Sequence, residues 1–431
     1  MYRALSLAIA ISGAAFAANA QAVPSAYDSA VVYLRQGDTA EAVAALRVAT
    51  RKAPSFGPAF LRLGSVLVAT ASEIPSDYNQ RVEADHALRR AQELLGDDPE
   101  VLVESGILLE KQQARTDARR VLDRAGRAAQ RRGDSLPPSL RAQLYYALAK
   151  IYQSWWEDWD HLVQLPRGAM PGCPRIDPVT GTWIQATAKE AIACPALWIR
   201  SLSNAVPLSD LKGDERERML SHLRLAFEAD SSLTDAAVRL LGHLAEAKAW
   251  STYDTVARRL EHVAPRDYRS YLFRALGFHE RGLDAPADSE FARALAIMPD
   301  DDRRVFANVA PLLPRGVRAH YLALDSTARA HTDRTFYAIV NPLYLTGVNE
   351  RELEHYARLA WADLQFGTPE AGLRGWDTDR GRIWVRYGEP SSVVMCCYGA
   401  AETGLDARYV FWAYGKYGPV FVFTKRSRTS K

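Results

Sequence analysis

Apolar residues recur at helical spacing from Tyr27 to about Pro299, in a stretch that consists mostly of Ala, Leu and Arg. Side chains that return at every third or fourth position lie on one face of an α-helix, and that face packs against a neighbour. The pattern therefore predicts a long succession of packed helices. After Asp300 the periodicity changes, so we expect a different architecture in the last part of the chain.

The helical stretch also repeats itself. The same intervals separate small, large and proline residues near both of its ends: Gly37, Ala42, Leu46, Ala49 and Pro54 first, and Gly282, Ala287, Phe291, Ala294 and Pro299 later. Small residues let two helices approach closely, a large one fills the gap between them, and proline ends the second helix. One such pair cannot bury its own apolar stripe, so we expect the pairs to stack.

This unit resembles the tetratricopeptide repeat (TPR), a helix–turn–helix of about 34 residues. Further positions fit the same frame in between: Phe60, Leu63, Gly64 and Leu67, then Gly106, Leu109, Ala118, Leu122 and Ala125. The resemblance implies a mainly α protein with a TPR-like α-solenoid, whose curved surface characteristically binds a peptide or protein partner. A helical domain without repeats is the alternative.

The pattern breaks in the segment 154–209, which reads as an insertion or as long connections packed against the solenoid. It is rich in proline and holds five tryptophans: Trp155, Trp156, Trp159, Trp183 and Trp198. Exposed rings of this kind could stack on sugars or hold a peptide. We favour the alternative that they fill the core of a loop-rich segment, because large aromatic side chains usually bury most of their area.

The last part of the chain predicts a small α+β domain. Glu350–Phe366 has the spacing of an amphipathic helix. Arg382–Tyr387, Ala407–Tyr414 and Val420–Thr424 read as strands of a short antiparallel sheet, and the turn Gly415–Gly418 suits a hairpin between the last two. Because these strands are apolar on both faces, we expect the Glu350–Phe366 helix to cover one face and solenoid helices the other.

One motif in this domain is more specific than helix packing requires. Trp376 reads as a buried anchor, and the turn after it contains aspartates that can accept backbone N–H groups, Asp379 above all. We expect Gly381 to adopt a positive φ that starts the strand, and Gly388 to form the exit turn.

The motif resembles that of the GWxTD domain, a module of exported bacterial proteins whose biochemical role is not established. The residues that carry the resemblance are Gly375, Trp376, Thr378, Asp379, Gly381, Arg386, Tyr387, Gly388 and Pro390. It covers about the last quarter of the chain, in a compact copy with a short stretch between Pro390 and Ala407. The resemblance identifies a domain and implies no reaction.

The same motif could also form a charged cleft. Asp377, Asp379 and Glu389 with Arg380 and Arg386 could supply a carboxylate pair for glycoside hydrolysis, or an anion site. The alternative is a turn whose aspartates cap backbone groups and pair with arginines, which polar turns do routinely. We favour the turn.

Signatures of enzymes and cofactors are not evident elsewhere in the sequence. No His follows His355, and His279-Glu280 reads as a surface pair on a helix. There is no nucleophile elbow, phosphate loop, dinucleotide fingerprint or metal-ligand spacing. We therefore predict no cofactor, no metal site and a role that is not enzymatic.

The first residues read as a secretory signal peptide, residues 1–22, with Arg3 before a short apolar, small-residue run. The protein is then exported, to the periplasm or the medium, and does not span a membrane once the signal is removed. In an oxidising compartment Cys173 and Cys194 could form a disulfide worth about 3 kcal/mol, with two free thiols as the alternative. Cys396 and Cys397 are adjacent in a strand and should face opposite sides.

Composition adds little to this picture. The net charge is +3 over 431 residues, which gives no drive toward nucleic acid. The expected organisation is a signal peptide over 1–22, TPR-like repeats over 23–153 and 210–300 around the segment 154–209, and a GWxTD-like domain over 301–431.

The function that fits best is an exported scaffold that binds a protein or peptide partner on its solenoid. The first alternative is a protein that binds or cleaves envelope glycans with the acidic turn, and the second is an envelope-assembly accessory factor. The sequence does not reveal the oligomeric state.

Overall fold

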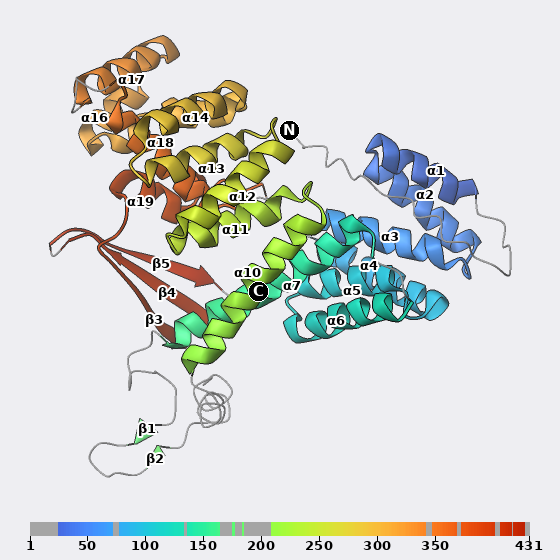
Figure 1. Cartoon of the computed structure of the whole chain (residues 1–431). Helices are drawn as coiled ribbons and strands as arrows, with labels where there is room; N and C mark the ends of the chain where they lie inside the picture. Colours follow the sequence, from blue (N-terminus) through green and yellow to red (C-terminus); the bar gives the residue numbers. More distant parts are fainter. Residues whose placement is uncertain are drawn as a thin grey trace. The chain divides into compact units, whose positions relative to one another are not determined.

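The computed structural model of the chain is shown in Figure 1. It describes residues 25–71, 77–132, 136–163, 175–176, 183–184, 208–341, 347–368, 372–400, 406–415 and 417–426. The predicted signal peptide and the predicted Cys173–Cys194 disulfide lie outside these residues. The chain divides into two compact units: residues 1–154 with 218–233, and residues 155–217 with 234–431.

The first unit is built from consecutive helix pairs. Its helices are α1 (Ser25–Gln36), α2 (Thr39–Lys52), α3 (Gly57–Thr70), α4 (Tyr78–Leu95), α5 (Pro99–Lys111), α6 (Arg115–Arg132), and parts of α7 (Pro138–Val163) and α10 (Leu208–Ala229). Each pair folds back on itself, and neighbouring pairs meet where α2 contacts α3 and α4 contacts α5. This succession confirms the predicted stacking of helices.

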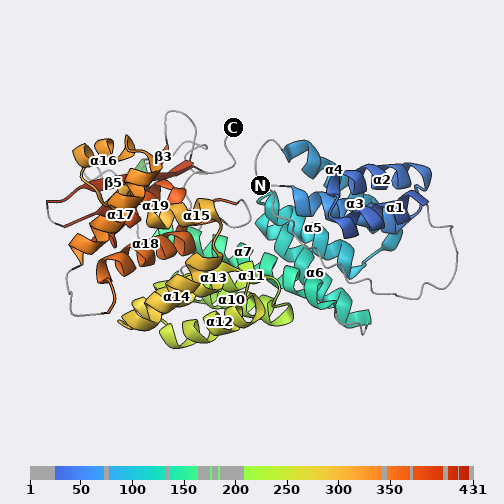
Figure 2. The ribbon, with the colours of Figure 1, turned by 90° about the horizontal axis from the view of Figure 1, so that it is seen from above.

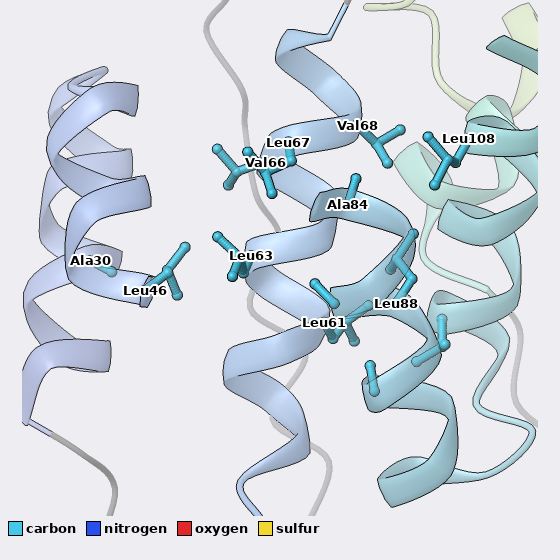
Figure 3. Packing of buried hydrophobic residues seen from close by; sticks show 13 residues of the cluster. Ala30, Leu46, Leu61, Leu63, Val66, Leu67, Val68, Ala84, Leu88 and Leu108 are labelled. Atoms are coloured by element: carbon cyan, nitrogen blue, oxygen red, sulfur yellow. The ribbon is translucent and has the colours of Figure 1, made fainter. Parts of the chain in front are cut away.

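Glycines opposite leucines set the distance within the pairs. A Cβ added at Gly64 would lie 2.6 Å from the Leu88 side chain, and one added at Gly106 would lie 2.5 Å from Leu122. Leu88 and Leu122 are almost fully buried, and Figure 3 shows Leu88 with Leu61 and Ala84 in this core. The alternation of small and large residues that defined the repeat is therefore the contact between the two helices of a pair.

Lysines tie successive pairs together. The Lys111 ammonium of α5 donates to the carbonyl oxygens of Val68 and Ala71 at the end of α3, at 2.6 and 2.8 Å. Lys150 of α7 donates to the Glu110 carboxylate of α5 at 2.5 Å. Helix carbonyls without a partner are satisfied in this way, and the stacking gains polar specificity.

The segment 154–209 falls between the two helices of one pair. The His222 ring of α10 lies 5.9 Å from Tyr145 and 5.2 Å from Tyr152 of α7, so these helices form a pair. Helix α7 continues to Val163, further than expected, and includes Trp155 and Trp156. Only two short antiparallel strands are described between α7 and α10, β1 (Arg175–Ile176) and β2 (Trp183–Ile184).

The second unit continues with more helices. They are α11 (Thr234–Glu246), α12 (Trp250–Val263), α13 (Tyr268–His279), α14 (Asp284–Ile297), α15 (Asp300–Ala307), a short turn η2 (Ala310–Leu312), α16 (Arg315–Leu322), α17 (Ser326–Val340) and α18 (Glu350–Phe366). The bounds of α18 are those predicted from its amphipathic spacing. Gly277 repeats the close contact of the first unit, because a Cβ there would lie 2.6 Å from the Tyr253 ring.

In this unit α11 pairs with α12 and α13 pairs with α14, and helix α18 lies across α11 and α13. Among helices α11 to α15 it contacts α13 most extensively, and also α11, α14 and α15 (Figures 1 and 2). The Gln365 amide donates to the Gly242 carbonyl of α11 at 2.8 Å, and the Tyr356 ring packs on Phe291 of α14 at 5.7 Å. The α+β part and this helical array therefore share one core within the unit.

Three antiparallel strands form the sheet near the C-terminus, in the order β3 (Ser392–Ala400), β4 (Asp406–Ala413) and β5 (Val420–Arg426). The register places Trp412 opposite Phe421 and Val410 opposite Phe423. The predicted hairpin between the last two strands is confirmed. Strand β3 lies in the short stretch between Pro390 and Ala407, and it contains Cys396 and Cys397, which were expected to lie in a strand.

The predicted strand Arg382–Tyr387 is wrong, because this segment belongs to helix α19 (Asp379–Tyr387). Its apolar residues also fit a helix, since the buried positions Gly381, Val385 and Gly388 are four and three residues apart. The helix begins at the Thr378 cap and ends where Gly388 adopts φ +75°. Six alternating residues are too short a pattern to predict a strand reliably, whereas the Thr378 cap and the Gly388 turn both mark the ends of a helix.

The ring contacts that α18 and α19 make with the sheet lie on one of its faces. Trp412 on that face lies 5.6 Å from the Phe366 ring of α18 and 6.1 Å from the Trp384 ring of α19, as expected for α18. Val420 and Val422 point to the opposite face and are 59% and 52% exposed. The expected second cover by solenoid helices is therefore wrong for these positions.

The close contact at Gly106 gives a direct test of the pairing. Gly106→Ala should cost about 1–2 kcal/mol of unfolding free energy, because the new methyl group overlaps Leu122. Gly126→Ala on α6 is the control, since no atom lies within 4 Å of a Cβ there. The unfolding free energy of this control should rise by up to about 1 kcal/mol, because alanine has the higher helix propensity. Urea unfolding followed by circular dichroism measures both, and equal effects of the two substitutions would rule out the proposed contact.

Candidate functional site

The GWxTD-like motif forms a tight turn against helix α18. A short 3₁₀ turn, η4 (Gly375–Asp377), leads into α19. A Cβ added at Gly375 would overlap the Ala362 carbonyl of α18, and one added at Gly381 would overlap the Gly375 carbonyl. Backbone cannot move aside as a side chain can, so both positions need glycine for close approach.

Trp376 anchors this turn as expected. Its side chain is 4% exposed, and its ring meets Phe306 of α15 edge-on at 5.5 Å. The Arg374 guanidinium lies 5.5 Å from the same ring. Edge-to-face and cation–π contacts of this kind add to the area that the indole buries.

Thr378, rather than Asp379, caps the helix that follows. Its hydroxyl donates to the Gly375 carbonyl at 2.6 Å and accepts the Gly381 N–H at 3.0 Å. Asp379 is exposed in the first turn, where its charge still suits the positive end of the helix dipole. The positive φ expected at Gly381 is also wrong, because only Gly388 of the two adopts it.

A buried network of hydrogen bonds and ion pairs fixes the turn to the neighbouring helices. The Gly375 N–H donates to Asp363 Oδ1 at 2.9 Å, and Arg374 Nη1 lies 3.7 Å from Asp363 Oδ2. Arg374 also donates to Asp302 at 2.6 Å, as does the Tyr268 hydroxyl at 2.7 Å. The network thus connects the motif to α13, α15 and α18 in one cluster.

Burial dominates the electrostatics of this cluster. It raises the pKa of Asp363, and the hydrogen bond from Gly375 and the charge of Arg374 act against that shift. Arg269, which is also buried, pairs with Asp267 at 2.7 Å and Asp235 at 3.1 Å. A network that satisfies its buried charges costs desolvation and in return favours one arrangement of the helices.

A second polar cluster lies at the other end of α13. His279 Nε2 lies 3.1 Å from the Glu354 carboxylate of α18, which also accepts from Arg358 at 2.6 Å. The hydrogen bond with His279 and the charge of Arg358 lower the pKa of Glu354 to about 2. Burial lowers the pKa of His279, but the hydrogen bond with Glu354 and the charges of Glu354, Glu280 and Asp284 together raise it. His279 is therefore an interhelical contact and not the surface pair with Glu280 that we expected.

The charged residues of the motif do not converge. Asp377, Asp379 and Glu389 are exposed, and no hydrogen bond or ion pair of theirs occurs among the residues that the structure describes. The Arg380 guanidinium lies 5.8 Å from the Phe423 ring. Arg386 donates to the Pro311 carbonyl at 3.4 Å. The arrangement offers no carboxylate pair with an orienting arginine, so the geometry gives the predicted acid or anion cleft no support.

The end of the motif packs on the sheet. The Tyr387 ring lies 5.3 Å from Tyr414 and 5.2 Å from Phe421. The Gly388 carbonyl accepts the Tyr414 hydroxyl at 3.0 Å, and half-buried Pro390 follows just before β3. The conspicuous residues of the motif are thus contacts between the turn, α18 and the sheet.

Over the described ranges, no group of three or more His, Cys, Asp or Glu residues is placed to hold a metal ion. In the same ranges, every helix is too short or too polar to cross a bilayer. The decisive carboxylate of the cluster, Asp363, was missed by sequence reasoning. It lies one turn from the end of a helix twelve residues before the motif, and nothing in its local pattern distinguishes it.

Comparison with models of known protein families gives no match, and comparison with curated proteins gives no significant match either. The fold is that of a mainly α-helical protein with stacked helix pairs and a small antiparallel sheet near its C-terminus. The resemblances to the TPR and to the GWxTD domain remain predictions.

Substitutions at Thr378 and Asp379 separate a structural cap from an acidic site. Thr378→Val should cost about 1–2 kcal/mol, because it removes both hydrogen bonds at nearly constant volume. Thr378→Ser and Asp379→Asn should each cost about 0.5 kcal/mol or less. Urea unfolding followed by tryptophan fluorescence measures the three variants. A larger loss for Asp379→Asn than for Thr378→Val would contradict this assignment.

Proposed function

We propose that this protein is an exported, non-enzymatic scaffold that binds a peptide or protein segment along helices α3, α5 and α7. These are the first helices of successive pairs, as α11 and α13 are in the second unit. The observation that carries the proposal is the difference between the two units. In the second unit α18 lies across this row of helices, whereas within the first unit no described helix does so.

Helix α18 illustrates what such a row can bind. It contributes apolar contacts through Tyr356 and one hydrogen bond from Gln365 to the helix backbone at Gly242. A Cβ at Gly242 would lie 3.4 Å from the α18 backbone, so a small residue on the row admits a helix closely. The equivalent surface of the first unit would accept a segment of similar character, with apolar and amide side chains.

Polar side chains give the surface of α3 and α5 its chemistry. Glu100 and Glu104 lie four residues apart on α5, and both interact electrostatically with Arg62 of α3. Burial raises the pKa of Glu104 to about 7, and the charges of Arg62 and Lys111 act against this shift. A partner that brings a cationic side chain would stabilise these carboxylates.

The predicted signal peptide supports the exported location. The GWxTD-like module would serve as a brace for the helical array and as a second binding surface. An envelope-assembly accessory factor is compatible with the same partner binding. The glycan-directed alternative has weaker support, because Asp377, Asp379 and Glu389 do not converge on one another.

Site-specific crosslinking tests this proposal. A photoreactive amino acid at Arg62 should give a discrete adduct with an envelope protein in cells, because this position lies on the open surface. The same amino acid at Arg89 on α4 is the matched control. Glu104→Gln should lower the yield of the Arg62 adduct several-fold. Equal adducts from Arg62 and Arg89, or none from Arg62, would refute binding on this surface.

A further inference from the structure

The uncovered face of the sheet exposes apolar side chains to solvent. Val420 and Val422 alternate with Phe421, which faces the helices, so both valines point away from α18 and α19. Their exposed fractions are 59% and 52%, and that of Tyr417 in the preceding turn is 90%. Exposed apolar residues that lie together on one face mark a candidate contact surface.

This part of the chain also has a charge of one sign. From Ala407 to Lys431 the sequence contains six basic residues and no acidic residue: Arg408, Lys416, Lys425, Arg426, Arg428 and Lys431. The other 406 residues carry 48 basic and 51 acidic residues. The positive net charge of the protein therefore comes from this segment, which favours a negatively charged partner.

Two kinds of partner could meet these conditions, an acidic polypeptide strand or an anionic lipid surface. A strand added at the edge of β5 would extend the sheet in its own plane. It would leave Val420 and Val422 exposed, because side chains stand perpendicular to that plane. The interface of a bilayer instead combines an apolar region that can bury the valines, a boundary zone that tyrosine favours, and anionic headgroups.

We propose that the β4–β5 hairpin docks this protein peripherally on anionic lipid bilayers. Tyr417, Val420 and Val422 enter the interface, and the basic composition of the segment favours anionic headgroups. The attachment does not require a spanning helix, and it is independent of the partner proposed for α3 and α5. Apolar area and basic charge are the two contributions that set such binding.

Vesicle sedimentation of the chain without its predicted signal peptide tests the docking. The protein should bind vesicles of phosphatidylcholine with about 30% phosphatidylglycerol, and bind phosphatidylcholine alone about tenfold less. Binding should fall steeply as salt rises, since the electrostatic part is screened. Equal binding to both kinds of vesicle, or binding to neither, would overturn the proposal.

Two double variants assign the binding to the hairpin. Val420→Ser with Val422→Ser, and Lys425→Glu with Arg426→Glu, should each lower the partition coefficient at least about tenfold. Val317→Ser, at another exposed apolar position of the same unit, should leave it unchanged. Circular dichroism checks that each variant is folded.

Full binding by both double variants, or an equal loss with Val317→Ser, would contradict the assignment. A polyglutamate peptide distinguishes the other partner. Binding to polyglutamate without binding to anionic vesicles would indicate an acidic polypeptide instead of a lipid surface.

Discussion

The close approach of the Gly375 turn to helix α18 is the constraint on which the second unit depends. At this point the backbone of one segment lies against the backbone of another, and the Gly375 N–H reaches the buried Asp363 carboxylate. The same helix packs on α11, α13, α14 and α15 through its other faces. Because α18 packs against both the helical array and the sheet, the motif affects the packing of helices far from it in the sequence. Its conspicuous residues are structural contacts.

The sequence allowed the repeated elements to be predicted because their signals are local and long. Gly106 and Leu122 belong to the repeated pattern of small and large residues, and the seventeen residues of α18 hold their spacing throughout. The α19 segment failed because six alternating residues fit a strand as well as a helix. Asp363 could not be found, because its role arises from a turn that returns to it only in the folded chain.

The two rows of first helices have different surroundings within their own units. In the second unit α18 fills the row and ends in a buried ionic network, so that surface is part of the core. In the first unit the row of α3, α5 and α7 keeps half-buried polar residues such as Arg62 and Glu104. Under the proposed function, an array of one architecture serves as a frame in one unit and as a binding surface in the other.

Hydrogen–deuterium exchange of Gly375→Ala tests the central claim most directly, with Gly316→Ala as control because a Cβ at Gly316 meets no atom within 4 Å. If the turn joins the array to the sheet, amides of α18, α19 and α13 should exchange at least about tenfold faster in Gly375→Ala, since a local opening there loses a shared core. Helices α3 to α6 of the first unit should keep their protection. Faster exchange confined to residues 375–388, or none at all, would contradict the account.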